Sequence, residues 1–212
     1  MSPFCRQAAI AALAIVMIAP LKGCDTPKTS QAGFLSDYGQ LRPNPDLDGA
    51  LHYKNPLTSL SRYNKFLIDG PMIYFVANSK ARGLNPEDIA KLSEYFRGEA
   101  IKQLTGRYQV VKLAGPGVLR LRFALTDLRE GSPILNIQPA TKLFGVGLGG
   151  ASLEAEAIDT QTGIRVMAVK DARQGERLSL EGLDKWDHAK QVMRYWVSRF
   201  VKQIDQAHGQ SQ

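Results

Sequence analysis

The sequence predicts an α+β fold of one domain, in which a mixed or antiparallel sheet of about five strands carries two main helices on one face. Residues 119–126 alternate apolar and polar side chains, which is the period of a half-buried strand. Residues 86–104 and 186–204 instead repeat apolar side chains every three or four positions, as amphipathic helices do. The order strand, helix, two hairpins, helix then leaves two helices to cover one sheet.

The first 23 residues have the pattern of an export signal. Residues 8–21 carry no charge, and this apolar run is shorter than the roughly 20 residues that span a bilayer. A small residue, Gly23, precedes Cys24, and this junction resembles the lipobox of bacterial lipoproteins, whose cysteine is acylated. We therefore predict a signal peptide at 1–23 and a lipid on Cys24 that attaches the mature chain to the membrane. Lys22 departs from the lipobox pattern, which leaves a cleaved signal without lipid and an uncleaved anchor as alternatives.

Cysteine content and charge agree with export. Cys5 lies in the predicted signal, so Cys24 is left alone and no disulfide forms within the mature chain. The formal net charge of +7 falls to +5 when Arg6 and Lys22 leave with the signal. This basicity favours an anionic membrane surface or an acidic partner. The basic residues are scattered and form no aromatic-basic motif, so we predict no nucleic-acid partner.

Residues 24–60 are predicted to tether and wrap the domain. The polar residues 25–30 follow the anchor, and 32–41 carry apolar side chains at a spacing that favours a short helical turn packed on the body. We expect the protein in the bacterial cell envelope, anchored on the periplasmic side. Asp25 directly after the acylated cysteine favours the inner membrane in the enterobacterial sorting rule, and the choice between the two membranes stays open.

The remaining elements are predicted within a domain at residues 61–207, followed by a disordered polar tail at 208–212. A strand at 65–75 is interrupted by Gly70-Pro71. The first helix begins after Asn85, whose side chain can cap it, with Pro86 at its first position.

The second half of the domain is predicted as two hairpins and a helix. Its strands are expected at 108–113, 119–126, 152–158 and 164–170. The turn at 159–163 ends in Gly163, which suits a left-handed conformation. The last helix is expected to begin at Asp184 as its capping residue, with Asp187 in its first turn and an apolar stripe that packs in the core.

Several segments resemble a known family. They are Gly33 to Tyr38 with Leu41, Ser61 to Lys65, Gly115 to Leu121, and Gly182-Leu183 with Trp186. These motifs are similar to those of the bacterial lipoprotein family catalogued as domain of unknown function number 3313. The resemblance covers nearly all of the mature chain. It implies an envelope lipoprotein and implies no particular activity.

Four charged residues are the candidates for a binding site. Arg120 and Arg122 are neighbours on one face of their strand, and Glu154 and Glu156 are neighbours on theirs. One interpretation is a site for an anion or an acidic partner. The simpler interpretation is an exposed row on an open sheet face, in which the acids lie opposite the arginines.

Residues 128–150 are predicted as a long apolar loop. Such loops are often functional, so this one is a candidate lid. Its last six residues, 145–150, contain a Gly-x-Gly-x-x-Gly pattern. Dinucleotide binding requires a helix after that pattern, whereas a strand is predicted here, so we expect no nucleotide cofactor.

The sequence favours a non-catalytic role. His52, His188 and His208 are dispersed without ligand spacing, and neither a nucleophile elbow nor a phosphate loop is present, so we expect no catalytic residues, metal or cofactor. The leading hypothesis is a lipid-anchored envelope module that binds or assembles with an envelope protein. The alternatives are an envelope hydrolase or ligand-binding enzyme with residues 128–150 as a lid, and a structural lipoprotein.

Overall fold

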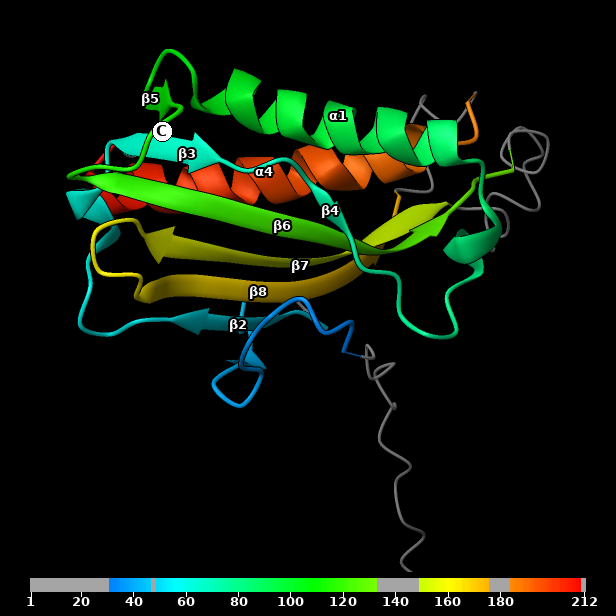
Figure 1. The fold of residues 1–212 in the computed structure, drawn as a ribbon, viewed down its shortest axis with the longest axis horizontal. Helices are drawn as coiled ribbons and strands as arrows, with labels where there is room; N and C mark the ends of the chain where they lie inside the picture. The colour runs from blue at the N-terminus through cyan, green and yellow to red at the C-terminus, as the bar shows by residue number, and fades with distance from the viewer. Residues whose placement is uncertain (1–30, 47–48, 133–148, 176–183, 211–212) are drawn as a thin grey trace, which may run out of the picture.

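The computed structural model describes residues 31–46, 49–132, 149–175 and 184–210, which form one sheet with two helices packed on it (Figure 1). The strands are β1 (Arg42–Pro43), β2 (Leu51–Lys54), β3 (Lys65–Ile68), β4 (Met72–Ile73), β5 (Gln109–Val111), β6 (Val118–Arg129), β7 (Gly150–Asp159) and β8 (Arg165–Gln174). The α-helices are α1 (Pro86–Leu104) and α4 (Asp187–Ala207), and the 3-10 helices are η1 (Leu60–Arg62) and η2 (Lys80–Gly83).

The predicted class, a single domain of mixed α and β structure, is confirmed, but the strand number is not. The described residues form a sheet of eight strands in the order β1-β2-β8-β7-β6-β3-β5, with β4 also paired to β6, rather than about five. The segment predicted as a tether contributes β1 and β2. The Gly70-Pro71 pair splits the predicted strand 65–75 into β3 and β4, because proline offers no amide hydrogen to a ladder.

The sheet is mixed in direction. Strands β3 and β4 pair in parallel with β6, and β5 pairs in parallel with β3. Strands β6, β7, β8 and β2 follow one another in antiparallel pairs. The β7–β8 hairpin turns where predicted, and Gly163 has a positive φ of 70° there.

The two helices begin differently. The side chain of Asn85 accepts a hydrogen bond from the amide of Glu87, and Pro86 occupies the first turn of α1, as predicted. The prediction that Asp184 caps the last helix is wrong, because the residue before α4 is Trp186 and no side chain caps the helix. The amide of Asp184 donates instead to Asp187 Oδ2 at 2.9 Å. No helix within the described ranges is both long and apolar enough to cross a bilayer.

The main core lies between the two helices and one face of the sheet. Phe123 of β6 contacts Phe96 of α1 edge-to-face, with ring centroids 4.5 Å apart. Phe66 of β3 contacts Phe200 of α4 in the same way at 6.0 Å. The alternating apolar residues of β6 therefore point toward the helices. We call this side of the sheet the helix face.

The opposite face is covered by residues 31–46, which we call the strap. Phe34, Leu35 and Leu41 of the strap are buried against Ala124 of β6 and Ala168 of β8. The predicted helical turn at 32–41 is wrong, because these residues form turns and bends and no helix. Its predicted packing on the body is confirmed. Both core clusters lie between residues 34 and 204 of the part of the chain that the structure describes.

The predicted loop at 128–150 is shorter at both ends than expected. Strand β6 continues through Arg129, and β7 already begins at Gly150. A Cβ atom on Gly150 would lie 2.3 Å from the carbonyl oxygen of Arg173 on β8, so close strand packing accounts for this glycine. Residues 133–148, which hold most of the proposed lid and the start of the glycine pattern, lie outside the described residues.

Candidate functional site

The four predicted charged residues lie on the face that the strap covers. Arg122 and Glu156 are registered opposite each other, and their side chains form an ion pair of 2.7 Å, as the alternation of charge suggested. The predicted exposure of the acids is wrong, because Glu154 is 0% and Glu156 6% exposed. The reason is the strap, which lies over β7 and takes the place of solvent.

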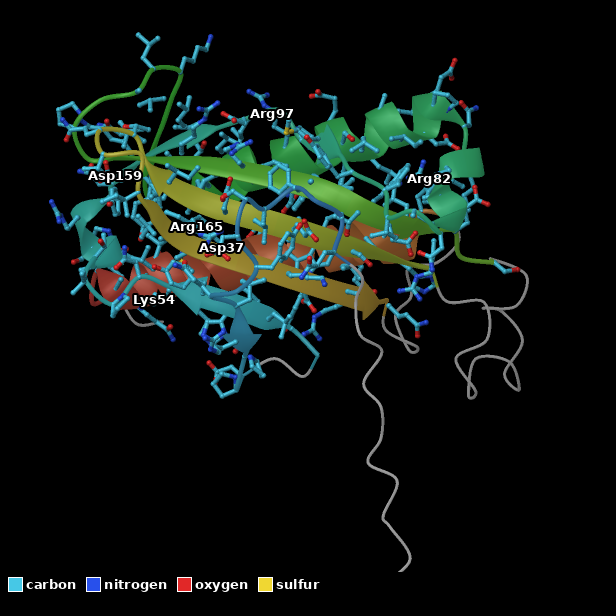
Figure 2. The ribbon with its side chains drawn as sticks, turned by 60° about the horizontal axis from the view of Figure 1, so that its bottom comes forward. Asp37, Lys54, Arg82, Arg97, Asp159 and Arg165 are labelled. Atoms are coloured by element: carbon cyan, nitrogen blue, oxygen red, sulfur yellow. The ribbon has the colours of Figure 1, made fainter. Side chains whose placement is uncertain are left out.

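A chain of ion pairs crosses this face. Both carboxylate oxygens of Asp69 accept hydrogen bonds from Arg120 Nε at 3.0 Å, and this contact raises the pKa of Arg120. Arg165 of β8 lies 4.0 Å from Glu156 and reaches the strap, where it donates to the carbonyl oxygen of Asp37 at 2.9 Å (Figure 2). The arginines therefore hold segments of this chain together.

Glu154 fixes the strap on the sheet. Its carboxylate accepts hydrogen bonds from the amides of Ala32 at 2.9 Å and Phe34 at 3.2 Å, and from the Tyr38 hydroxyl at 2.5 Å. Burial and the bond to this carboxylate raise the pKa of Tyr38 to about 12. Lys170 is registered opposite on β8, where burial lowers its pKa and the charge of Glu154 opposes that shift. Glu154 is thus a structural acid.

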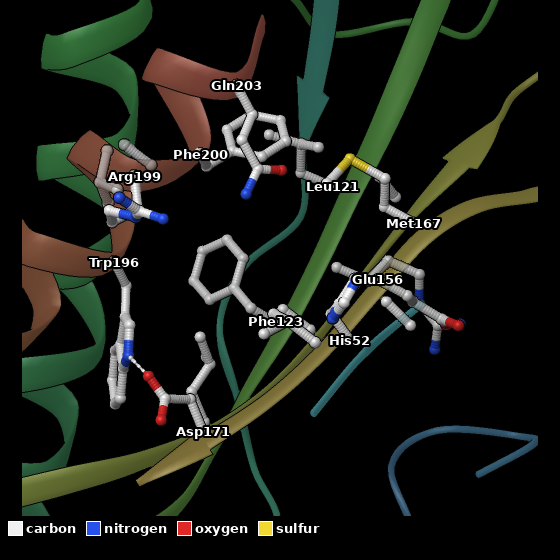
Figure 3. A pocket seen from close by; sticks show the side chains of 18 of the residues that line it. His52, Leu121, Phe123, Glu156, Met167, Asp171, Trp196, Arg199, Phe200 and Gln203 are labelled. Carbon is white, nitrogen blue, oxygen red and sulfur yellow. Dashed lines mark hydrogen bonds and ion pairs between the residues drawn. The ribbon is translucent and has the colours of Figure 1, made fainter. Parts of the chain in front are cut away.

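A groove of about 140 Å³ lies on the helix face, between α4 and strands β7, β8 and β2 (Figure 3). Its floor follows the register of the sheet, in which Ala155, Val169 and His52 lie side by side in one row. Met167 lies in the next row along β8. The small side chain of Ala155 on β7 leaves space above the floor. All four of these floor side chains are only partly buried, so the groove is open to solvent.

The opposite wall comes from one side of α4. Trp196, Phe200 and Gln203 follow one another at helical spacing and line the groove together with Arg199. The Trp196 indole donates to Asp171 Oδ2 at 2.9 Å, which fixes the ring against the floor. The rings of Trp196 and Phe200 make this wall largely apolar.

Two polar atoms at the groove lack hydrogen-bond partners among the described residues. They are Nδ1 of His52 on the floor and Nε of Arg199 on the wall, and both are buried. An unpaired buried polar atom costs stability, and a bound group that offers a hydrogen bond removes that cost. The groove can thus hold an apolar group and bond to a polar atom beside it.

The acidic and histidine side chains outside the groove have structural contacts. Within the described ranges, no cluster of three histidine, cysteine, aspartate or glutamate side chains is placed to hold a metal ion. His188 is 2% exposed and packs against glycines, since a Cβ on Gly175 would lie 2.4 Å from its Cδ2. His208 contacts the carbonyl oxygen of Tyr63 at 3.0 Å. These two histidines therefore have structural surroundings.

The sequence alone does not reveal the groove. The apolar stripe of the last helix predicts core packing, which is correct for Met193 and Ile204 but incomplete for Trp196 and Phe200, which also line the groove. His52 has the sequence context of a surface or packing residue. The one usable signal is the small size of Ala155 among larger strand residues, and it gives no indication of which element lies above it.

The structure thus defines a single α+β domain with a strapped face and a grooved face. The chain belongs to the family described as protein of unknown function (DUF3313), whose model matches residues 30–200. No curated protein matches it.

Several solved structures are similar in fold. A PelC dodecamer carrying one leucine-to-methionine substitution and a second PelC dodecamer, both from Paraburkholderia phytofirmans, are each 12% identical, with TM-scores of 0.42 and 0.41. The first match covers 73% of this chain and 95% of that one, and the second covers 70% and 96%. Protein XCC0632 from Xanthomonas campestris is 10% identical at a TM-score of 0.38, and the match covers 74% of this chain and 94% of that one.

Proposed function

We propose that this protein is a lipid-anchored, non-catalytic binding module of the bacterial cell envelope, whose groove receives a bulky apolar side chain of an envelope protein partner. The observation that carries the proposal is the groove itself. It is a preformed, solvent-open and largely apolar site in a domain whose charged candidates already bond to other groups of this chain.

The size of the groove selects the occupant. Its volume of about 140 Å³ is close to that of a cavity of about 150 Å³, which accommodates benzene. One aromatic ring or branched aliphatic side chain fits this space, whereas drug-sized ligands occupy about 300–1,000 Å³. A buried apolar anchor surrounded by weaker polar contacts is the usual centre of a protein–protein interface. Arg199 and His52 supply polar contacts next to such an anchor.

The membrane anchor is supported by the sequence and by the position of the strap. Cys24 is eight residues before Ala32, which is bonded to Glu154. Eight residues reach at most about 29 Å when fully extended. A lipid on Cys24 therefore keeps the domain close to the membrane surface, with the strap as the point of attachment.

The experiment that tests the groove is a substitution that fills it. Ala155→Leu adds three carbon atoms to the floor. We expect it to raise the free energy of unfolding by about 0.5–2 kcal/mol, because it fills a cavity. A photo-crosslinking residue in place of Gln203, at the rim, should capture a partner in intact cells. Ala155→Leu should reduce that capture by about tenfold or more, because it occupies the space of the anchor.

Ala90→Leu is the matched control, since Ala90 is exposed on α1 and lies outside the groove. It should leave both capture and abundance unchanged. If Ala155→Leu folds normally and captures the partner as well as the natural chain does, the groove is not the binding site. Repeated capture of nothing but the protein itself would also contradict the proposal.

A further inference from the structure

Three exposed apolar side chains gather at one end of the domain. Leu57 is 90%, Leu113 79% and Ile164 52% exposed. They belong to three loops: the turn after β2, the β5–β6 loop and the β7–β8 hairpin. Figure 1 shows these loops at the same end of the molecule, which we call the hairpin end.

Hydrogen bonds hold the three loops together. The amide of Asn55, beside Leu57, donates to the carbonyl oxygen of Val166 at 2.8 Å, which joins the first loop to the hairpin. The hydroxyl of Thr160 in the hairpin donates to the carbonyl oxygen of Gly115 at 2.9 Å, which joins the hairpin to the third loop. The apolar tips therefore form one fixed surface.

This surface is surrounded by positive charge. Lys54, Arg62, Lys65 and Lys112 lie in or next to these loops, and none of them has a carboxylate within 4.0 Å among the described residues. Asp159, an acid of the hairpin turn, accepts hydrogen bonds from the Tyr63 hydroxyl and from the turn amides. Figure 2 shows Lys54 and Asp159 toward the same end of the domain.

We propose that the hairpin end docks on an anionic phospholipid surface. Apolar side chains that enter the interface together with cations that meet the lipid headgroups are the combination that binds proteins to such membranes. The charge pattern favours a lipid surface over a protein partner. Four cations without a carboxylate partner surround the three apolar tips. A membrane of anionic lipids offers negative headgroups to all four cations and an apolar interior to the tips. The docking would give the anchored domain one fixed orientation.

The geometry permits the anchor and this surface to reach one membrane. Asp159 in the hairpin lies five positions along β7 from Glu154, which holds the start of the strap. At about 3.3 Å per strand residue, this separation is about 17 Å. It is shorter than the reach of about 29 Å between Cys24 and Ala32. The proposal rests on one part of the proposed function, the lipid on Cys24, because that lipid brings the hairpin end to the membrane surface.

The test uses residues 25–212, which retain the complete described core and lack the acylated cysteine. Vesicles of phosphatidylcholine alone are compared with vesicles containing phosphatidylglycerol in a flotation assay at low and high salt. We expect binding to the anionic vesicles that salt weakens and that neutral vesicles do not support. Leu57→Asn, Leu113→Asn and Ile164→Asn combined should reduce binding by about tenfold or more.

The matched control is Met72→Asn with Ile73→Asn, two exposed apolar residues of β4. It should bind vesicles as the natural sequence does, and thermal unfolding checks that each variant is folded. Lys54→Gln with Lys112→Gln should weaken binding by about fivefold per charge.

Absence of binding to anionic vesicles overturns the proposal, as does equal binding by the triple variant. Self-association that the triple variant abolishes, without vesicle binding, would instead show that the hairpin end is an interface between proteins. Because the tested chain lacks Cys24 and keeps the groove, these outcomes are distinguishable from a failure of lipidation or of the groove.

Discussion

Removing the Glu154 carboxylate should release the strap. Glu154→Ala leaves the amides of Ala32 and Phe34 and the hydroxyl of Tyr38 without their acceptor. Each buried donor left without a partner costs about 1–3 kcal/mol. The change also removes the negative charge registered opposite the buried Lys170, a charge that favours the protonated form of this lysine.

These costs overlap, because a released strap admits water to the freed groups. From the three donors left without an acceptor, we therefore expect a total loss of about 3–5 kcal/mol in the free energy of unfolding. Urea unfolding of residues 25–212 measures this loss, and hydrogen exchange at the amides of Ala32 and Phe34 reports whether the strap has left the sheet. Both amides should lose their protection.

The control is Glu94→Ala, which removes an exposed acid of α1 and should change the free energy of unfolding by no more than about 0.5 kcal/mol. A loss below about 1 kcal/mol for Glu154→Ala, with unchanged exchange at the two amides, would refute the assignment of Glu154 as the residue that fixes the strap.

Two further predictions concern packing and pH. Gly150→Ala should destabilise the protein by about 3 kcal/mol in thermal unfolding, because the new Cβ would overlap the backbone of β8, whereas an equal stability would contradict this close approach of the two strands. Burial and hydrogen bonds to carboxylates raise the pKa values of Tyr38, Tyr63 and Tyr108 to about 12 from 10.0. The contribution of these protonated tyrosines to the free energy of unfolding is therefore complete below pH 10 and is lost as the pH rises toward 12. Absorbance titration of the phenolates should show these tyrosines ionising late, and ionisation of all seven together near pH 10 would count against these bonds.

Short sequence motifs predicted the elements whose boundaries depend on neighbouring residues in the chain. Asn85 and Pro86 mark the start of α1 in sequence and in structure, because a cap and a fixed φ act on their own helix. The alternation in β6 predicted which residues face the helices. The interruption at Gly70-Pro71 was placed correctly, since it depends on the chemistry of proline alone.

Features that depend on distant segments were not predictable. Strands β1 and β2 are two and four residues long and carry little periodicity of their own, and β2 is held by pairing with β8, more than a hundred positions later. Alternation placed Glu154 and Glu156 on one face but did not reveal that the strap covers that face. The groove has the same origin, because it depends on where α4 lies above Ala155.

The mass of the intact protein extracted from bacterial membranes tests the proposed lipid anchor. A chain that begins at Cys24 and carries the added mass of a diacylglycerol and an N-linked acyl group is the predicted result. A chain that begins elsewhere, or that begins at Cys24 without acyl mass and is recovered in the soluble fraction, would contradict it.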